Sequence, residues 1–362
     1  MSQSAAEDRP LVSLVLPAYN EAGVLEENMQ VIQDYLASLA DRYRFEVLVV
    51  NDGSADATGA FATGLARRFT NMRVLSHPRN FGLGQAFKTA FAASRGDYVI
   101  TMDVDLSYSV DHIGKLLEAI VSTRAKLVLA SAYMEGGRVT NVPALRRTLS
   151  IWGNRFLRMF ARGGISTLTC MVRAYDGPFV RSLILRSTGM EIMPEVVYKT
   201  MILRGHIVEV PAHLDWSRQI QAGPRRSSSM RILRHVLSTL ISGFVFRPFV
   251  MLMLPGLVLL AFSAYVNFWV LVVFLQALSA VGAYPAEAAA VVYRDHPQTL
   301  FIGVLSLVLA IQLISLGALS LQKKKYFEET YYADVQLRRL IDELAARVDQ
   351  DRPSPRHLSG RP

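Results

Sequence analysis

The sequence predicts an α/β domain with a mainly parallel sheet, followed by two helices that are long and apolar enough to cross a membrane. Two observations predict this architecture. Short β-rich runs alternate with helical runs from Leu11 to about Leu214, and two uncharged apolar stretches follow over residues 248–278 and 300–322. The chain has 362 residues, a length that allows one large domain with additions or two smaller domains. Of these residues 51% are hydrophobic, and the formal net charge is +9.

The alternation is clearest in the first hundred residues. Runs rich in apolar and β-branched residues predict strands, namely L-V-S-L-V-L-P from Leu11, F-E-V-L-V-V-N from Phe45, M-R-V-L-S from Met72 and D-Y-V-I-T-M from Asp97. Apolar residues at helical spacing predict helices between them, over residues 21–39, 57–69 and 84–94. Strands that alternate with helices indicate βαβ units, and ligands of such sheets bind beyond the carboxyl ends of the strands.

The N-terminus and the single cysteine limit the classes of protein. Residues 1–10 have no basic flank followed by an apolar core, so they are predicted to be disordered and not a signal peptide. The front of the protein is therefore expected to begin in the cytoplasm. Cys170 is the single cysteine, which excludes an intrachain disulfide and a multi-cysteine metal site.

The composition changes after Trp216, and the α/β domain (11–227) is expected to end in the basic, loop-like stretch that follows. Residues 228–247 have apolar side chains at helical spacing with basic residues between them, which is typical of a helix lying at a membrane interface. An ordinary packed surface helix is the alternative. Residues 248–322 are predicted to form a transmembrane hairpin, with spans at about 248–275 and 300–322.

Basic residues flank this hairpin on both sides. They are Arg225, Arg226, Arg231, Arg234 and Arg247 before it and K-K-K at 323–325 after it. The positive-inside rule places both flanks, and so both termini, in the cytoplasm, in an integral membrane protein. Residues 323–362 are predicted to be an amphipathic helix to about Asp351 and then a disordered tail.

The stretch T-M-D-V-D sets two carboxylates, Asp103 and Asp105, one residue apart at the end of a predicted strand. Adjacent carboxylates repel each other unless a cation neutralises them, and Mg²⁺ or Mn²⁺ typically binds one or two carboxylates together with substrate phosphates. A solvated acidic loop is the alternative. The position at a strand end, in line with two other polar clusters, favours the metal site.

Those two clusters follow the first and second strands. Asn20 and Glu21 offer acceptors suited to a ribose or a base, although a helix N-cap with first-turn acids explains them equally well. Asp52, in N-D-G-S, is a further acceptor for a base or ribose, and a plain turn is its alternative.

The stretch N-F-G-L-G-Q-A-F from Asn80 contains two closely spaced glycines. It is not the first βα turn and lacks a third glycine, so a dinucleotide-binding fingerprint is disfavoured. The glycines are expected to allow a tight turn into the next helix, with Lys88 facing a phosphate.

Together these motifs resemble the family 2 glycosyltransferases of GT-A fold. The ordered set is P-A-Y-N-E, N-D-G-S, N-F-G-L-G-Q-A, G-D-Y-V-I-T-M-D-V-D-L, E-G-G-R and R-A-Y, and it covers about Leu11 to Ser229. The chain more closely resembles the polyprenyl-phosphate (dolichyl-phosphate) sugar synthases that carry a C-terminal membrane hairpin. The resemblance implies inverting transfer of a hexose from a UDP- or GDP-linked sugar to polyprenyl phosphate at the cytoplasmic face of the membrane.

The resemblance also implies roles for individual residues. Asp103 and Asp105 would be the catalytic pair that binds Mg²⁺ or Mn²⁺ and the donor diphosphate. The nucleotide would contact Pro17, Tyr19, Asn20, Glu21, Asp52, Gly53, Lys88, Asp103 and Val104. The lipid phosphate and the diphosphate would contact Arg138, Arg146, Arg147, Arg173, Arg218, Arg225 and Arg226. The expected partners are the nucleotide-sugar, polyprenyl phosphate and the bilayer, with no nucleic acid; association of copies is left open.

Several positions depart from the family pattern. Asn51, Ser107 and Ala132 replace residues common in relatives, and A-G-P-R-R-S-S-S lacks the usual G-x-S-K. These changes leave the sugar and the grip on the lipid phosphate open. The alternatives are transfer to another lipid, transfer to a growing polysaccharide, and a catalytically silent membrane partner. A Q-x-x-R-W motif and further spans, typical of the polysaccharide synthases, are not seen, and both carboxylates are retained, against a silent partner.

Overall fold

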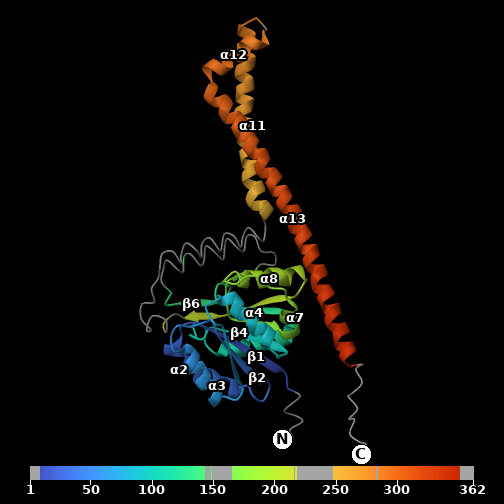
Figure 1. Ribbon diagram of the computed structural model, residues 1–362. Helices are drawn as coiled ribbons and strands as arrows, with labels where there is room; N and C mark the ends of the chain where they lie inside the picture. Colours follow the sequence, from blue (N-terminus) through green and yellow to red (C-terminus); the bar gives the residue numbers. More distant parts are fainter. Residues whose placement is uncertain are drawn as a thin grey trace, which may run out of the picture. The chain divides into compact units, whose positions relative to one another are not determined.

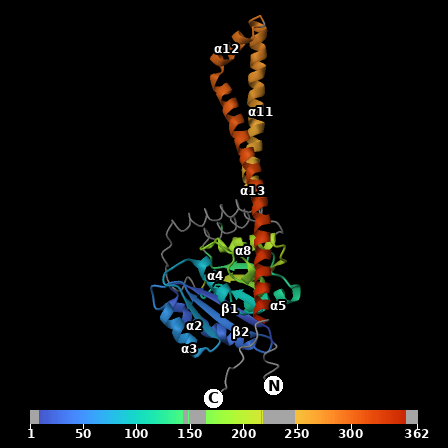
Figure 2. The ribbon, with the colours of Figure 1, turned by 45° about the vertical axis from the view of Figure 1, so that its right-hand side comes forward.

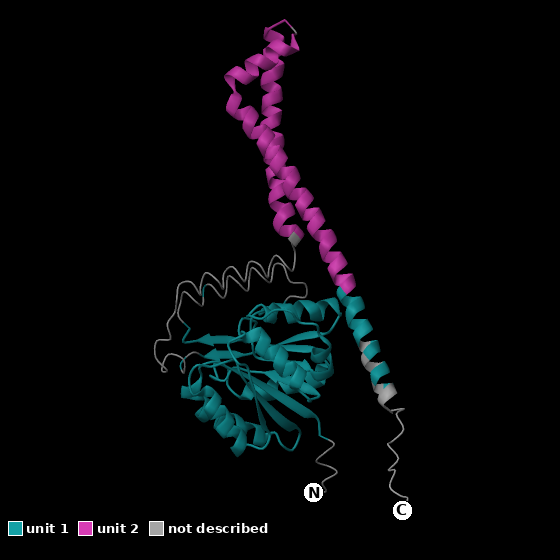
Figure 3. Ribbon diagram, in the orientation of Figure 1, with its two compact units in different colours: residues 1–242, 331–362 teal, residues 243–330 magenta. Residues whose placement is uncertain are grey.

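The structure is a computed structural model that describes residues 9–142, 148, 165–215, 217, 248–282 and 284–350. The chain forms two compact units, residues 1–242 with 331–362, and residues 243–330 (Figure 3). The juxtamembrane helix predicted for 228–247 and the tails predicted to be disordered, except Arg9 and Pro10, lie outside the described residues.

The first unit is built on a seven-stranded sheet with the order β3-β2-β1-β4-β7-β5-β8 (Figure 1). Its strands are β1 (Leu11–Ala18), β2 (Arg44–Asn51), β3 (Met72–Ser76), β4 (Tyr98–Thr101), β5 (Leu127–Ser131), β7 (Arg173–Asp176) and β8 (Ile207–Pro211). All neighbours pair in parallel except β7, which is antiparallel to both β4 and β5. The prediction of a mainly parallel α/β sheet is confirmed. A separate parallel pair joins β6 (Arg138–Thr140) to β9 (His213–Asp215).

Helices cover both faces of this sheet (Figures 1 and 2). They are α2 (Ala22–Ser38), α3 (Thr58–Arg68), α4 (Leu83–Ala93), α5 (Asp111–Thr123), α7 (Gly177–Ser182) and α8 (Ile192–Ile202). Successive strand residues point to opposite faces, so Leu14 and Leu16 enter the core shared with α2, α3 and α5. On the other face Tyr175 of β7 meets Phe91 of α4, with ring centroids 5.3 Å apart. Burial on both faces explains why these strands are almost continuously apolar.

Two helices, Phe249–Ala280 and Pro297–Arg338, meet the length and hydropathy of membrane spans, and all of the first and most of the second belong to the second unit. The first lies in α11 (Pro248–Ala280) and the second in α13 (Pro297–Gln350). Between them lies α12 (Pro285–Asp295), a helix where the sequence suggested only a loop. The two predicted spans are therefore confirmed as long apolar helices.

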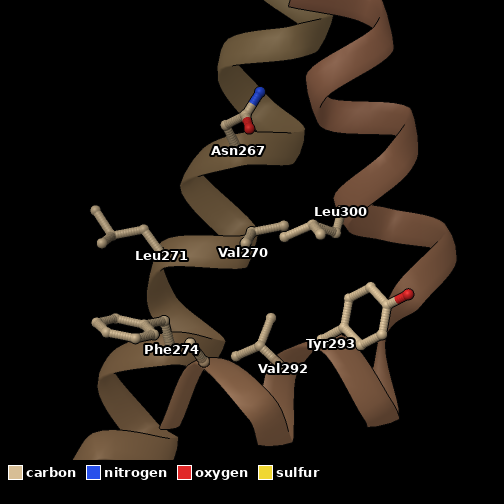
Figure 4. Close-up of a pocket in the computed structure, with 8 residues that line it drawn as sticks. Asn267, Val270, Leu271, Phe274, Val292, Tyr293 and Leu300 are labelled. Carbon is tan, nitrogen blue, oxygen red and sulfur yellow. The ribbon is translucent and has the colours of Figure 1, made fainter. Parts of the chain in front are cut away.

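Polar contacts join the two long helices inside this unit. Ser263 Oγ and Asn267 Nδ2 of α11 donate to the carbonyl of Gly303 in α13 at 3.1 and 3.0 Å. Next to Asn267 an apolar hollow of about 510 Å³ lies between α11, α12 and the start of α13 (Figure 4). Its other lining residues are Val270, Leu271, Phe274, Ala289, Val292, Tyr293 and Leu300.

Helix α13 does not stop at the lysine run. It continues through Lys323–Lys325 to Gln350, so the predicted tail helix is the same helix as the second span. The residues after Gly317 are mostly good helix formers with no proline or glycine to end the helix. Lys324 and Glu328 add a pair one turn apart at 3.7 Å.

Candidate active site

The three polar clusters singled out in the sequence meet at one edge of the sheet. Parallel pairing sets Ala18 of β1 beside Asn51 of β2, and Val15 of β1 beside Thr101 of β4. The segments that follow these strands, residues 19–21, 52–58 and 102–107, therefore emerge side by side at the carboxyl ends of the strands. This adjacency is what a ligand that contacts all three segments requires.

The first two segments are tied together by hydrogen bonds. Asn20, with a left-handed φ of 56°, donates its N–H to Ser54 Oγ at 3.1 Å and accepts from Ala55 N at 2.9 Å. The Glu21 N–H donates to Thr58 Oγ1 at 2.8 Å. These bonds hold Glu21 at the start of α2, with its carboxylate half-buried. Main-chain contacts therefore fix the place of Glu21 at this edge of the sheet.

The D-V-D segment is held by two polar side chains. Asn28, buried in α2, donates from Nδ2 to the Val104 carbonyl at 2.9 Å. Ser107 donates to Asp105 Oδ1 from its N–H at 3.0 Å and from its hydroxyl at 2.6 Å. Two donors on one oxygen fix the orientation of the Asp105 carboxylate.

Asp103 lies among negative charges. Burial raises the pKa of Asp103 to about 8, and the charges of Asp105 and Glu21 add to this rise. A divalent cation bound beside Asp103 would replace the proton that burial and the charges of Asp105 and Glu21 favour there. Within the described ranges no group of three His, Cys, Asp or Glu side chains is placed to hold an ion. Phosphate oxygens of a ligand would therefore complete the coordination of a cation here.

Replacing Asp103 by asparagine is expected to stabilise the metal-free protein. Because the folded-state pKa is raised, the folded state binds this proton more tightly, and the resulting stability is lost as the pH rises through about 8. The variant lacks this loss, so its free energy of unfolding above pH 8 should exceed that of the wild type by about 1–3 kcal/mol, discounted for partial solvent contact.

Thermal unfolding of the full chain with a chelator measures this gain, which should shrink as the pH falls toward 4. Adding Mn²⁺ should reverse the order, because only the wild type retains both carboxylates. A variant less stable than the wild type at pH 8.5 without metal would contradict the expectation.

Asp52 is already fully engaged. Its Oδ1 contacts His77 Nδ1 at 2.7 Å and accepts from Phe81 N at 3.0 Å, and its Oδ2 accepts from Gly82 N at 2.8 Å. The side chain is buried and fastens the end of β2 to the turn that opens α4. Its predicted contact with the nucleotide stays a prediction, and its observed contacts shape that turn.

The first unit of the chain is similar in sequence to known proteins. Residues 13–177 match the family described as Glycosyl transferase family 2. The undecaprenyl-phosphate mannosyltransferase of Micrococcus luteus is 31% identical over 206 residues, which cover 55% of this chain and 82% of that protein. This chain belongs to glycosyl transferase family 2. The match to a second relative, glycosyltransferase AglD of Haloferax volcanii, is 34% identical over 165 residues and spans 46% of this chain but only 26% of that protein.

A solved structure is also similar to this family 2 chain. It is glucosyl-3-phosphoglycerate synthase from Mycobacterium tuberculosis, crystallised with Mn²⁺, uridine diphosphate and glucosyl-3-phosphoglycerate. The TM-score is 0.48 at 22% identity, over 67% of this chain and 82% of that chain.

The arginines expected to bind the acceptor or the diphosphate of this glycosyltransferase are not gathered in the described site. Arg173 is fully buried, and its guanidinium donates to the carbonyls of Leu168, Cys170 and Met193 at 2.7–2.8 Å. Arg173 thus ties three main-chain carbonyls together, a role that the sequence did not suggest, and its contact with the acceptor stays a prediction. Arg138 is among the described residues. The other predicted arginines lie outside them, namely Arg146, Arg147, Arg218, Arg225 and Arg226.

Arg138 is exposed at the start of β6, in register with His213 of β9. It lines a hollow of about 720 Å³ that also contacts Lys115 and Glu118 of α5. At the other end of β9, the Asp215 N–H donates to the Ser107 carbonyl at 2.9 Å, so it is this end of the strand that contacts the segment after the D-V-D pair. The acceptor role of Arg138 stays a prediction.

The remaining predicted nucleotide contacts lie around the same edge. Pro17 is half-buried in β1 and Tyr19 is exposed after it. Gly53 follows Asp52 with a left-handed φ of 64°. Lys88 lies on α4, and its Nζ donates to the Arg186 carbonyl at 3.3 Å, a partner that the sequence did not suggest for a phosphate-facing lysine.

Sequence reasoning missed the residues that support this family 2 site, namely Asn28, Ser107 and His77. Asn28 lies on the apolar face of α2 beside Leu25 and Met29, and a polar residue on such a face is a signal of a buried hydrogen bond. Ser107 was seen only as a departure from the family pattern. For His77 the sequence carries no signal, because its partner Asp52 is distant along the chain.

Proposed function

We propose that this protein transfers a hexose from a UDP- or GDP-linked sugar to polyprenyl phosphate, with inversion at the anomeric carbon. The observation that carries the proposal is the cluster of Asp103, Asp105 and Glu21 at the carboxyl ends of β1 and β4, in a family 2 chain that also has two apolar helices. The name of the Micrococcus luteus relative, undecaprenyl-phosphate mannosyltransferase, supports this acceptor class. The identity of the hexose and of the base is left to experiment.

The donor binds along the edge where the first three segments emerge. Glu21 and the main chain around Asn20 and Asp52 face the nucleoside, as expected for acceptors at a parallel sheet's carboxyl edge. Asp105, oriented by Ser107, holds the divalent cation together with Asp103. That cation, Mg²⁺ or Mn²⁺, supplies positive charge for the leaving nucleoside diphosphate.

The reaction is a single displacement. A phosphate oxygen of the acceptor attacks the anomeric carbon, the bond from that carbon to the nucleoside diphosphate breaks, and an α-linked donor gives a β-linked product. A phosphate monoester is anionic near neutral pH, so the attacking oxygen needs no strong general base. The protein therefore acts mainly by positioning and by electrostatic stabilisation of the leaving group.

The two apolar helices anchor the protein in the membrane, with the glycosyltransferase unit on the cytoplasmic side as the flanking basic residues predict. An acceptor phosphate at the bilayer surface is then within reach of the site without a search through bulk solution. This arrangement favours a lipid-linked acceptor over a soluble one.

The test is transfer from radiolabelled UDP- and GDP-hexoses to a short polyprenyl phosphate by the full chain in detergent, with Mn²⁺ or Mg²⁺. The expected product is a polyprenyl phosphate hexose of β configuration, and its formation should stop when the cation is chelated. Label transferred to diacylglycerol or to a polymer would assign one of the alternative acceptors. Absence of any transfer and of any nucleotide binding would favour the silent membrane partner.

A further inference from the structure

The segment between α7 and α8, residues 183–189, lies against the turn that opens α4. The Thr188 carbonyl accepts from Gly84 N at 2.8 Å and from Gln85 N at 3.3 Å, so it caps the first turn of α4. That turn begins at Gly82, whose N–H donates to Asp52 at 2.8 Å. The position of segment 183–189 is therefore transmitted to a turn that borders the candidate nucleotide site.

Two side chains of α8, the half-buried Glu195 and the buried Lys199, hold the main chain of this segment. Glu195 accepts from the N–H groups of Arg186 and Ser187 at 2.9 and 2.8 Å. Lys199 is only 4% exposed, and its ammonium donates to the Ile184 carbonyl and to Glu195. Lys199 and Glu195 pair with each other and are each bonded to the same loop, so together they form a charged clamp on it.

The third side of the clamp comes from the part of α13 that belongs to the first unit (Figure 3). The Tyr331 hydroxyl accepts from the Ile184 N–H at 3.2 Å, and the Lys199 ammonium lies 5.0 Å from the centre of the Tyr331 ring. Tyr331 is 5% exposed and Val335, one turn later, is fully buried. Their neighbour Tyr332 is 47% exposed, so one face of this helix segment packs and another does not.

We infer that Tyr331 and Lys199 are positioning residues for the donor site. By fixing both main-chain groups of Ile184 they hold segment 183–189 against the α4 turn, and so they set the affinity for the nucleoside diphosphate part of the donor. This inference rests on the proposed function. The part of α13 that follows the second apolar stretch then contributes to donor binding, while the apolar stretch itself anchors the protein in the membrane.

The physical reason lies in the kind of contact. Segment 183–189 touches the α4 turn through a main-chain carbonyl, so its effect depends on where the chain lies and not on which side chain it carries. Removing the Tyr331 hydroxyl leaves a part-buried N–H at Ile184 without this acceptor, which favours displacement of the segment toward water. Once the segment moves, the turn loses the Thr188 carbonyl and is less well ordered for a nucleotide.

The test compares Tyr331→Phe and Tyr331→Ala with the matched controls Tyr332→Phe and Tyr332→Ala, in the full chain in detergent. Binding of UDP and of GDP in the presence of Mn²⁺ is measured by calorimetry, and transfer kinetics with both substrates varied. Tyr331→Phe keeps the ring beside Lys199 and should fold. It should weaken nucleoside diphosphate binding roughly three- to tenfold and raise the donor KM by the same factor, with the acceptor KM unchanged.

Amide exchange gives a readout of the structural step. Exchange should become faster in Tyr331→Phe than in Tyr332→Phe at Ile184 and at Gly84, whose N–H donates to the Thr188 carbonyl. This inference alone would be overturned if the wild type binds a nucleotide and both Tyr331→Phe and Tyr332→Phe bind it with the same affinity. A wild type that binds neither nucleotide would overturn the proposed function and this inference with it.

Discussion

Replacing Asp105 by alanine is expected to lower kcat/KM for sugar transfer on the order of a thousandfold, while the protein stays folded. Asp105 is the carboxylate that Ser107 orients through two hydrogen bonds, and it lies beside Asp103. Its removal takes away one of the two proposed metal ligands and the charge that holds the cation near the leaving diphosphate. Transfer assays with saturating Mn²⁺ measure the loss.

Two variants give this experiment its controls. Ser107→Ala removes one donor to Asp105 but keeps the main-chain N–H, so a smaller loss, about tenfold or more, is expected. Asp111→Asn changes an exposed carboxylate of the same stretch that pairs with Lys115, and it should leave transfer nearly unchanged. An Asp105→Ala protein with more than a tenth of wild-type activity would show that the metal assignment is wrong.

Gly53→Ala is expected to destabilise the first unit by about 3–5 kcal/mol. Gly53 has a φ of 64°, and a Cβ atom there would lie 2.1 Å from the carbonyl carbon of Arg79 and 2.4 Å from its Cα. Both atoms belong to the main chain, so the contact cannot be relieved by rotating a side chain. The segment after β3 would have to move, and with it the turn that Asp52 holds.

The matched control is Gly64→Ala, in the exposed middle of α3. A Cβ atom at Gly64 meets nothing within 4 Å, so this change should stabilise the protein by roughly 0.5–1 kcal/mol through helix propensity. Thermal and chemical unfolding of both variants, followed by tryptophan fluorescence and circular dichroism, measure the difference. A Gly53→Ala protein as stable as Gly64→Ala would mean that the close approach of Arg79 is relieved without cost.

Local patterns were sufficient for the fold and for the place of the carboxylate pair in it. The strands at Leu11, Phe45, Met72 and Asp97 alternate with helices at the predicted places, because burial on both faces demands continuous apolar runs of limited length. The edge at which the polar clusters meet follows from parallel pairing alone. Asp103 and Asp105 were therefore recognised from their place at the end of a strand.

Contacts between distant segments were beyond the reach of these patterns. Arg173 was expected at the acceptor, but β7 inserts it between α8 and the sheet, where three carbonyls bind it. Lys88 was expected at a phosphate and instead contacts Arg186, nearly a hundred residues later. In each case the residue type is right for an anion, and its partner is set by which loop the fold brings to it.

The sequence by itself determined the α/β sheet, the two apolar helices and the carboxylate pair, because periodicity and strand ends are local properties. Only the tertiary structure decided that Asp52 fastens the α4 turn and that Tyr331 of α13 holds Ile184. These contacts join residues 30 to 147 positions apart. Their partners are main-chain groups, which are present at every residue and so leave no mark in the amino-acid sequence.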